Sequence, residues 1–331
     1  MAFKICTIGC GNISNSNHGP AYKRYKEANP DVILAGCCDL DEEKARRYKE
    51  SFGFERYYTD LHEMIEKEKP DAVCAAVNEA IAAEVGCAVM EHGVPLFLEK
   101  PPGKNSTETM RLIETAEKTG VPNMVAFNRH FIPLMRECKE VMKNIKEPML
   151  YIRYDFCRHE RNDDDFSDTA IHAIDAVRFL TDDDYEKVTF SYQKVDQRAD
   201  SVYLQADMKK GTKAFVHVLP GCGIVLERAT IHYRDYTILL CLPIWGDGFD
   251  IPGSLTVLHN GVVEHEVKGE TLCPTGELFI TNGFYDENRV FFDSLQQGTP
   301  FESTLKRSLQ SILVKEAYAR GDQCWEDQNK N

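Results

Sequence analysis

The sequence predicts two domains of different fold class: an α/β domain with a doubly wound parallel sheet, then an α+β domain with an open, mostly antiparallel sheet. In residues 1–128, short apolar runs alternate with helical patterns, which is typical of parallel strands joined by helices. In residues 129–331, strand-like runs follow one another with few helices between them. The length of 331 residues is also typical of two domains.

The first domain begins with a strand and a glycine turn. Gly9 and Gly11 follow the apolar run 3–8 as in the Gly-x-Gly-x-x-Gly pattern, with Ser14 in the third place. Gly9 would make the tight turn, and Gly11 would let backbone N–H groups approach a pyrophosphate. Because residues 15–20 are polar and end in proline, we expect the helix to begin only near Pro20 and the loop over the phosphates to be long.

A second strand over residues 31–38 ends at Asp39. An acid at this place accepts hydrogen bonds from the ribose hydroxyls of NAD, and it would repel the 2′-phosphate of NADP. The sequence therefore favours NAD, with NADP less favoured. The alternative is that this acidic segment only caps the helix that follows over residues 42–52.

The alternation of strands and helices then continues. Asp60 with Glu63, and Asn105 with Glu108, match the capping-box pattern at the start of a helix. Another helix is expected over residues 79–92. The remaining strands of the first domain are predicted at residues 56–58, 71–77, 94–98 and 123–127.

The run 94–98 has the composition of a fully buried parallel strand, and Pro101 and Pro102 prevent it from continuing. Lys100 is therefore expected at the carboxyl end of a central strand, where open α/β sheets hold their ligands. The alternative for any single lysine is a solvated surface position.

The second domain is predicted to form an open sheet with one covered face, because polar and apolar residues alternate in Val188–Tyr192. We expect its exposed face to hold a homo-oligomer together, as a dimer or tetramer. Two helices, over residues 280–297 and 303–320, close the chain. The expected strands cover residues 150–156, 187–195, 201–208, 213–219, 224–232 and 236–242.

One helix of the second domain carries a polar side. We expect Ser167 to cap it, and at about 100° per residue Asp168, His172 and Asp175 lie opposite its apolar side. Asp168 and His172 are four residues apart and can touch, so the carboxylate can orient the imidazole or favour its protonated form. The alternative is a solvated face, although the polar loop at 158–165 is typical of a cleft edge.

Composition excludes several classes of function. The net charge of −14 disfavours nucleic acid and anionic membranes as partners. No apolar run reaches the roughly 18 residues of a membrane span, and the chain enters a strand without a signal peptide, so we expect a cytoplasmic protein. The 12 cysteines include no Cys-x-x-Cys and no zinc-finger spacing, which predicts free thiols and no metal site.

Taken together, the motifs resemble the glucose-fructose oxidoreductase / inositol dehydrogenase / rhizopine catabolism protein family, usually written Gfo/Idh/MocA. The resemblance implies an N-terminal Rossmann domain, a C-terminal sheet domain and NAD(P)-dependent oxidation or reduction, mostly of sugars and cyclitols. It also implies a cis peptide bond between Lys100 and Pro101. The matching blocks are Gly9-Cys10-Gly11-Asn12-Ile13, Asp39, Glu99-Lys100-Pro101, Val125-Ala126-Phe127-Asn128-Arg129 and Asp168-x-x-x-His172-x-x-Asp175.

Position by position, the resemblance makes Lys100 the active-site lysine, His172 the acid/base histidine and Asp168 its carboxylate neighbour. We expect a second group of residues to hold the cofactor: Gly9, Gly11, Asn12, Ile13, Asp39, Asn78 and Glu99.

Arg129, Arg158 and His159 are candidates for binding substrate oxygens, and a surface ion pair is the alternative for each. Two departures from the family pattern leave the substrate open. Residues 76–81 lack the histidines that many relatives have, and residues 163–166 replace the usual glycines.

Three function classes follow. The favoured one is an NAD-dependent dehydrogenase or reductase that acts on a sugar, cyclitol or derivative. A glycosidase that uses tightly held NAD transiently is the second, and a non-catalytic NAD and sugar sensor is the third. The presence of Lys100, Asp168 and His172 argues against the sensor.

Overall fold

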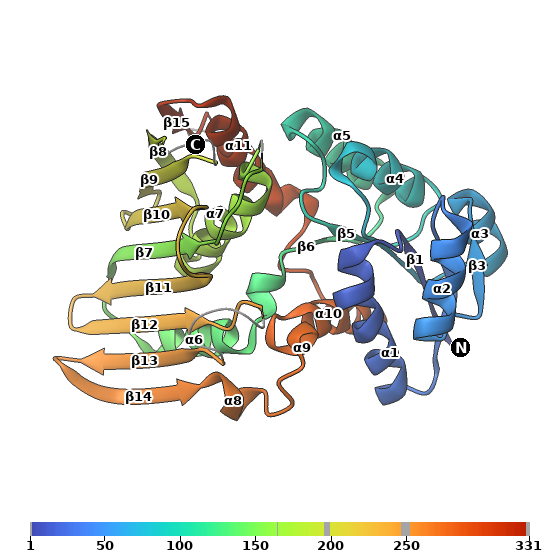
Figure 1. Cartoon of the computed structure of the whole chain (residues 1–331), viewed down its shortest axis with the longest axis horizontal. Coiled ribbons are helices and arrows are strands. Elements are labelled where there is room, and N and C mark those ends of the chain that lie inside the picture. Colours follow the sequence, from blue (N-terminus) through green and yellow to red (C-terminus); the bar gives the residue numbers. More distant parts are fainter. Residues whose placement is uncertain (1, 164, 195–198, 246–251, 329–331) are drawn as a thin grey trace. The chain divides into compact units, whose positions relative to one another are not determined.

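The computed structural model describes residues 2–163, 165–194, 199–245 and 252–328. The chain forms two compact units (Figure 1). The first unit contains residues 1–128 together with 284–309. The second contains residues 129–283 and 310–331. The segment 284–309, which the sequence analysis placed in the second domain, therefore lies with the first unit.

The first unit contains a six-stranded sheet in which every neighbouring pair is parallel. The strand order is β3-β2-β1-β4-β5-β6, so the order reverses between β1 and β4. Open α/β sheets bind ligands at such a switch point, outside the carboxyl ends of the strands. This confirms the predicted doubly wound sheet. The strands are β1 Phe3–Ile8, β2 Val32–Cys38, β3 Arg56–Tyr58, β4 Ala72–Ala75, β5 Leu96–Glu99 and β6 Asn123–Ala126.

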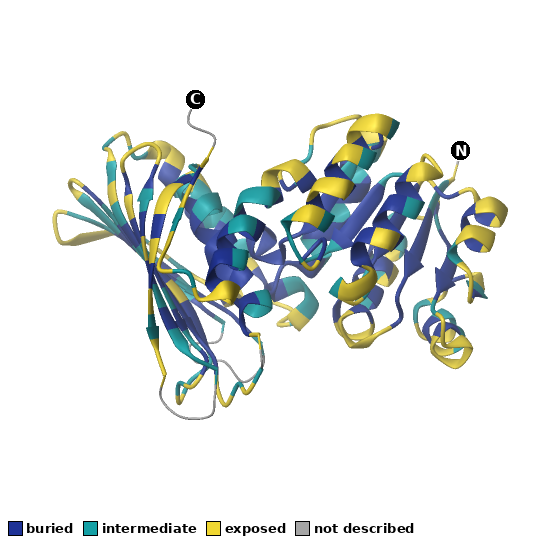
Figure 2. Cartoon of the chain, turned by 90° about the horizontal axis from the view of Figure 1, so that it is seen from above, coloured by how far each residue is buried: buried dark blue, intermediate teal, exposed yellow. Residues whose placement is uncertain are grey.

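Helices cover this sheet, and Figure 2 shows buried strands beneath helices whose outer faces are exposed. Asp60 accepts a hydrogen bond from Glu63 N at 2.8 Å, and Asn105 accepts one from Glu108 N at 2.9 Å, which confirms both predicted helix starts. The helices are α1 Gly19–Ala28, α2 Glu42–Phe52, α3 Leu61–Glu68, α4 Glu79–Glu91, α5 Ser106–Thr119 and α10 Phe284–Gln297.

The expectation of a long loop before Pro20 is wrong. The chain becomes helical at Asn12, passes through a π-helical turn (Ser14–His18) and continues directly as α1. The polar side chains that suggested a loop bond locally instead. Asn15 Nδ2 donates to the carbonyl oxygens of Cys10 and Gly11, at 2.7 and 2.9 Å. A π-turn accommodates such a segment within a helix and is frequent at functional sites.

The second unit contains a nine-stranded sheet in the order β14-β13-β12-β11-β7-β10-β9-β8-β15. Among the strand pairs of the described residues, only β7–β10 is parallel, which confirms a mostly antiparallel sheet. Six strands match predicted ones, although Val195, at the end of one prediction, lies outside the described residues. Their bounds are β7 Met149–Cys157, β8 Tyr185–Gln193, β9 Ser201–Met208, β10 Lys213–Leu219, β11 Leu226–Tyr233 and β12 Tyr236–Leu242.

The sequence analysis did not predict the strands at the two edges of this sheet. These are β13 Ser254–His259, β14 Val262–Lys268 and β15 Cys324–Glu326. The side chains of β14 are mostly exposed, so the strand lacks the apolar alternation by which the others were recognised.

Helices α6 Pro133–Asn144, α7 Ser167–Thr181 and, from residue 310, α11 Leu305–Arg320 cover one face of the nine-stranded sheet and form the core with it. The shorter helices of this part of the chain are η2 Asn128–Phe131, α8 Gly269–Leu272 and α9 Leu278–Thr281. Within the described part of the chain, no helix has both the length and the apolar composition that crossing a membrane requires. The 12 cysteines are free, as predicted.

Helix α7 packs its apolar side into this core, as its periodicity predicts. Its start differs from the prediction, because Ser167 is the first helical residue and makes no side-chain cap. Asp165 instead accepts a hydrogen bond from Ser167 N at 2.8 Å. The polar side of α7 is not a solvated face, since His172 and Asp175 are buried.

Candidate active site

The turn after β1 requires glycine at residue 9. Gly9 has a φ of +92°, and a Cβ atom there would lie 2.2 Å from the carbonyl oxygen of Ala76. Its N–H donates to Cys38 O at 2.8 Å. The turn is therefore held tightly between the ends of β2 and β4.

Gly11 presents the opposite situation, because a Cβ built on it would meet nothing within 4 Å. The helix begins directly after it, and its first residues Asn12 and Ile13 are exposed. Open space beside a helix N-terminus is what a dinucleotide pyrophosphate needs. The residues present therefore fit NAD at this turn.

Asp39 lies at the end of β2 with both carboxylate oxygens engaged. Oδ2 accepts from Cys10 N at 2.8 Å, and Oδ1 accepts from Asp41 N at 3.0 Å. The cap of α2 is Asp41, which accepts from Glu43 N and Lys44 N at 3.1 and 3.2 Å. Asp39 is thus fixed beside the glycine turn, and its contact with the ribose of NAD stays a prediction.

The end of β5 is held by Glu99. Its Oε1 lies 2.9 Å from His18 Nε2, and its Oε2 accepts a hydrogen bond from Lys100 N at 2.9 Å. Lys100 is partly buried and its peptide bond to Pro101 is cis, as the family resemblance implies. His18 was not among the predicted site residues, because residues 15–20 were expected to form a loop.

Asn78, a predicted cofactor residue, follows β4. Its Oδ1 accepts a hydrogen bond from Ala80 N at 2.9 Å, so the side chain caps α4. A role of Asn78 at the cofactor stays a prediction.

In the second unit, Asp168 is ion-paired with Lys315 of α11. Lys315 is only 4% exposed. His172, on the next turn of α7, is 8% exposed. The sequence analysis missed Lys315. The position of Lys315 in its helix was the one indication of its burial. Lys315 lies at helical spacing from Ser308 and Ser311, and both serines are buried.

Asp175 links α7 to its neighbours. Its Oδ2 lies 2.5 Å from His130 Nε2, and its Oδ1 accepts from the hydroxyl of Ser311 at 2.8 Å. Burial raises the pKa of Asp175, but contacts with His130, together with the charge of Arg178 and the hydrogen bond from Ser311, outweigh burial and lower the pKa. These contacts make Asp175 a structural residue within this unit.

Arg129 and Arg158 both bind the buried carboxylate of Glu227. Arg129 Nη2 lies 2.8 Å from Glu227 Oε1, Arg158 Nη2 contacts the same oxygen, and Tyr154 donates to Oε2 at 2.7 Å. Burial alone would raise the pKa of Glu227. The two guanidinium groups have the larger effect, and they lower this pKa to about 2. These are buried ion pairs, not the surface pairs considered as the alternative. His159 is exposed.

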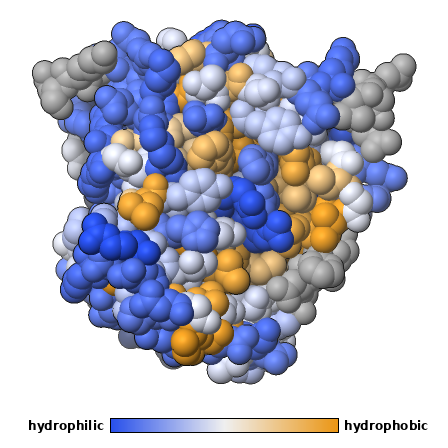
Figure 3. Space-filling model, turned by 90° about the vertical axis from the view of Figure 1, so that its left-hand side faces the viewer, coloured by the Kyte–Doolittle hydropathy of each residue, from blue (hydrophilic) through white to orange (hydrophobic). Residues whose placement is uncertain are grey.

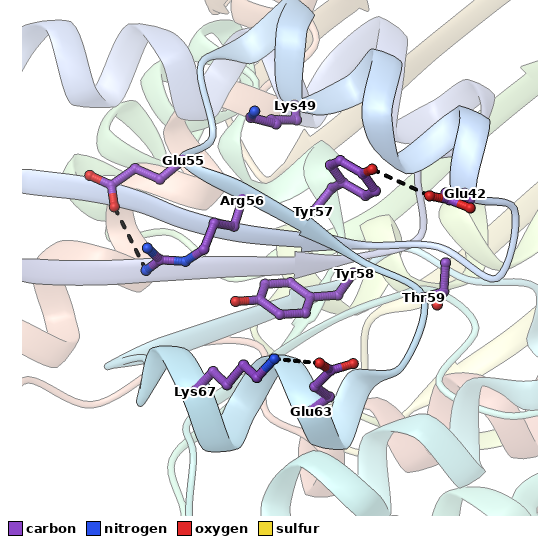
Figure 4. Close-up of a pocket in the computed structure, with 9 residues that line it drawn as sticks. All are labelled: Glu42, Lys49, Glu55, Arg56, Tyr57, Tyr58, Thr59, Glu63 and Lys67. Atoms are coloured by element: carbon purple, nitrogen blue, oxygen red, sulfur yellow. Dashed lines mark hydrogen bonds and ion pairs between the residues drawn. The ribbon is translucent and has the colours of Figure 1, made fainter.

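A depression at the edge of the first sheet contains none of the predicted site residues (Figure 4). It lies between α2 and α3 along β3, and its polar groups contact one another. Tyr57 donates to Glu42 at 3.3 Å, and Lys67 donates to Glu63 at 2.5 Å. Its lining residues are Glu42, Lys49, Glu55, Arg56, Tyr57, Tyr58, Thr59, Glu63 and Lys67.

Comparisons with known proteins agree with this geometry. Residues 3–127 match the sequence model of an oxidoreductase family with an NAD-binding Rossmann fold. Myo-inositol 2-dehydrogenase from Thermotoga maritima is 29% identical over 203 residues, which cover 56% of this chain and 57% of that protein. The chain thus matches little more than half the length of this curated relative.

Two solved structures share the fold over nearly the whole chain. An oxidoreductase from Agrobacterium radiobacter, in complex with NAD⁺, L-tartaric acid and magnesium, has a TM-score of 0.81 at 20% identity, with 98% of each chain covered. Levoglucosan dehydrogenase in complex with NADH has a TM-score of 0.82 at 18% identity, again with 98% of each chain covered.

Proposed function

We propose that this chain is a member of the Gfo/Idh/MocA family, whose model its residues 3–127 match, and that it is an NAD-dependent oxidoreductase acting on a secondary alcohol or ketone of a sugar, cyclitol or sugar derivative. One observation carries the proposal. Lys100 directly follows β5, at the carboxyl ends of the strands in an NAD-binding Rossmann sheet. The similarity to a myo-inositol 2-dehydrogenase supports a polyhydroxylated substrate.

Bound NAD supplies the hydride acceptor, and the chain supplies proton transfer and charge stabilisation. In the oxidative direction His172 removes the proton of the substrate hydroxyl, and in the reverse direction it returns the proton. Lys100 donates a hydrogen bond to the same oxygen and stabilises the negative charge that develops on it. Asp168 keeps these two groups positioned and suitably charged. Its carboxylate also forms an ion pair with Lys315.

The cofactor is held by the glycine turn and by the end of β2. Gly9 would make the tight turn, and Gly11 would leave room for the pyrophosphate. The helix start at Asn12 and Ile13 would lie next to the pyrophosphate. The carboxylate of Asp39 would accept hydrogen bonds from the ribose hydroxyls. Arg129, Arg158 and His159 remain proposed contacts of the substrate.

We further propose that the chain forms a homodimer or homotetramer through the uncovered face of the nine-stranded sheet. Figure 3 shows the side of the molecule where this sheet lies, with apolar side chains among polar ones. The rings of Tyr151 and Phe215 lie 5.3 Å apart, and those of Tyr151 and His232 lie 5.7 Å apart. Leu239, on an adjoining strand, is 44% exposed. Exposed apolar side chains of this kind on one face of a sheet favour association.

The test is a panel of sugars and cyclitols, each incubated with NAD and separately with NADP while reduced nicotinamide is followed. Oxidation of at least one polyol with NAD supports the proposal. Aryl glycosides are incubated in parallel without added oxidant. Release of phenol without net formation of NADH would contradict the proposal and indicate a glycosidase instead. Binding of NAD and a sugar with no turnover of any substrate would contradict the proposal and indicate a non-catalytic sensor.

A further inference from the structure

A row of hydrogen bonds runs through the interior of the first unit and ends at Lys100. Asn288 Nδ2 donates to Phe284 O at 2.7 Å and lies 3.0 Å from His18 Nδ1. The other ring nitrogen of His18 lies 2.9 Å from Glu99 Oε1. The second oxygen of Glu99 accepts from Lys100 N at 2.9 Å. We call these side chains of Asn288, His18 and Glu99 the relay.

The relay fixes the position of the proton on His18. A backbone carbonyl oxygen can only accept, so the Asn288 atom beside Phe284 O must be the amide NH₂. The same nitrogen faces Nδ1 of His18, which therefore offers a lone pair and carries no proton. The proton of the neutral ring consequently lies on Nε2, where it is donated to Glu99. His18 is thus held as the Nε2–H tautomer.

The relay is also rigid, because its members are buried. His18 and Asn288 are 0% exposed, and the side chain of Glu99 is 12% exposed. The His18 ring packs in T-shaped arrangements with Phe97 and Phe284, whose ring centroids are 5.8 and 5.4 Å away. A buried side chain packed in this way has little freedom to rotate.

We propose that His18 and Asn288 are positioning residues for Lys100. The inference rests on the proposed function, in which the ammonium of Lys100 binds the reacting oxygen. Glu99 can hold the backbone at Lys100 only while its own orientation is fixed, and the Nε2–H of His18 fixes it. Asn288 in turn presents His18 in the one tautomer that can donate there.

The same place has the composition of a metal site, because His18, Glu99 and Glu287 bring ligand atoms within 4.8 Å of one another. The tautomer argues against that use. A metal ligand needs a nitrogen lone pair, whereas Nε2 carries the proton and the lone pair of Nδ1 already accepts from Asn288. The geometry therefore favours a positioning relay over a bound cation.

The tautomer is tested by ¹⁵N NMR of the full chain with labelled histidine at pH 7.5, with His18→Gln identifying the signal. We expect a neutral ring protonated on Nε2, and a spectrum that EDTA leaves unchanged. A ring protonated on Nδ1, an imidazolium, or a change on adding EDTA would overturn the inference. This readout does not depend on activity.

Positioning is tested by comparing His18→Leu with His18→Gln, whose amide nitrogen can occupy the place of Nε2. The Leu variant should lower kcat by about 10- to 100-fold, as expected for a small misplacement. The affinity for NAD should not change, and the Gln variant should recover most of kcat. Equal losses in both variants, or an unchanged kcat in the Leu variant, would overturn the inference.

The matched control is Asp293→Asn on the same helix as Asn288. It alters the 2.7 Å hydrogen bond from Tyr25 between α1 and α10 but does not touch the relay. Hydrogen exchange at the Lys100 amide should accelerate in His18→Leu and stay slow in Asp293→Asn. Lack of any oxidation by the wild type would reject the proposed function. The NMR and exchange results would still decide the relay.

Discussion

Lys315 of α11 forms an ion pair with Asp168 at the first turn of α7, and the lysine side chain is almost completely buried. The cationic partner of Asp168 is thus a residue more than a hundred positions away in the sequence. The sequence analysis considered only His172, four residues further along the same helix. A buried lysine is costly unless its charge is compensated, so Lys315 needs the carboxylate of Asp168.

Replacing Lys315 with Met should remove that compensation. Asp168 is 32% exposed and can be partly solvated, so we expect a loss of about 1–3 kcal/mol in the free energy of unfolding. kcat should also fall if Asp168 acts as proposed. Urea unfolding and steady-state kinetics measure the two effects. Lys187→Met, which removes an exposed pair with Glu326, is the control and should cost less than about 1 kcal/mol. Equal losses in both variants would contradict the role of Lys315.

Lys100→Met and His172→Asn should each reduce turnover by about 10²- to 10⁴-fold, the usual range for acid–base groups. NAD affinity should be preserved, because neither residue belongs to the glycine turn. Steady-state kinetics and NAD titration separate the two quantities. Lys104→Met, an exposed lysine four residues further on, is the control. Normal turnover by the Lys100 variant on the true substrate would show that the assignment is wrong.

Much of the first unit could be predicted from local patterns. The apolar run before Pro101 ends at a fixed place because proline cannot continue a strand, so the position of Lys100 followed from sequence. The glycine turn was equally predictable, because Gly9 and Gly11 directly follow the apolar run 3–8. Both features depend on neighbours along the chain or on simple strand order.

Other features depend on partners distant in sequence. Residues 15–18 look like a loop because Asn and Ser favour turns, yet here Asn15 bonds back to the backbone and His18 lies in the interior against Asn288. Arg129 finds Glu227 98 positions away. The periodicity of a sequence gives no information on contacts between residues that are distant along the chain. The relay and the buried arginines therefore could not be predicted.

Asp39 should determine the preference for NAD. Asp39→Ser removes the carboxylate expected to receive the ribose hydroxyls, and hydrogen bonds to a charged group are worth about 1.5–3 kcal/mol. We therefore expect kcat/KM for NAD to fall by about 10- to 100-fold and NADP to become a comparable cofactor. Asp41→Asn keeps the α2 cap and should leave the preference unchanged. Undiminished discrimination against NADP in the Asp39 variant would remove the basis for this assignment.

Leu239 tests the proposed interface. Leu239→Asp places a charge on the uncovered face of the sheet, where burial against a second copy would be unfavourable. Sedimentation velocity should show a shift from dimer or tetramer to smaller species. Val262→Asp, at an exposed position of the edge strand β14, is the control and should not change the assembly. A wild type that sediments as a monomer would contradict the interface directly.

Glu227 should make stability depend on pH below about 4.5. Its folded-state pKa of about 2 lies below the ordinary value for glutamate, roughly 4.3. A lowered folded pKa means that the carboxylate stabilises the fold above its unfolded-state pKa. This stabilisation is lost as the pH falls through the folded value. Arg129 and Arg158 are the physical cause, because their charges outweigh the effect of burial.

Glu227→Gln should therefore be less stable than the wild type at pH 6 by about 3–5 kcal/mol, since it leaves two buried guanidinium groups without a counter-charge. The difference should narrow as the pH is lowered from about 4.5 towards 2, because the wild-type carboxylate becomes protonated as well. Urea unfolding at several pH values measures both curves. Glu326→Gln, at an exposed pair, should show a small and nearly constant difference. A gap for Glu227→Gln that stays as wide at pH 3 as at pH 6 would mean that the two arginines do not hold this carboxylate in its charged form.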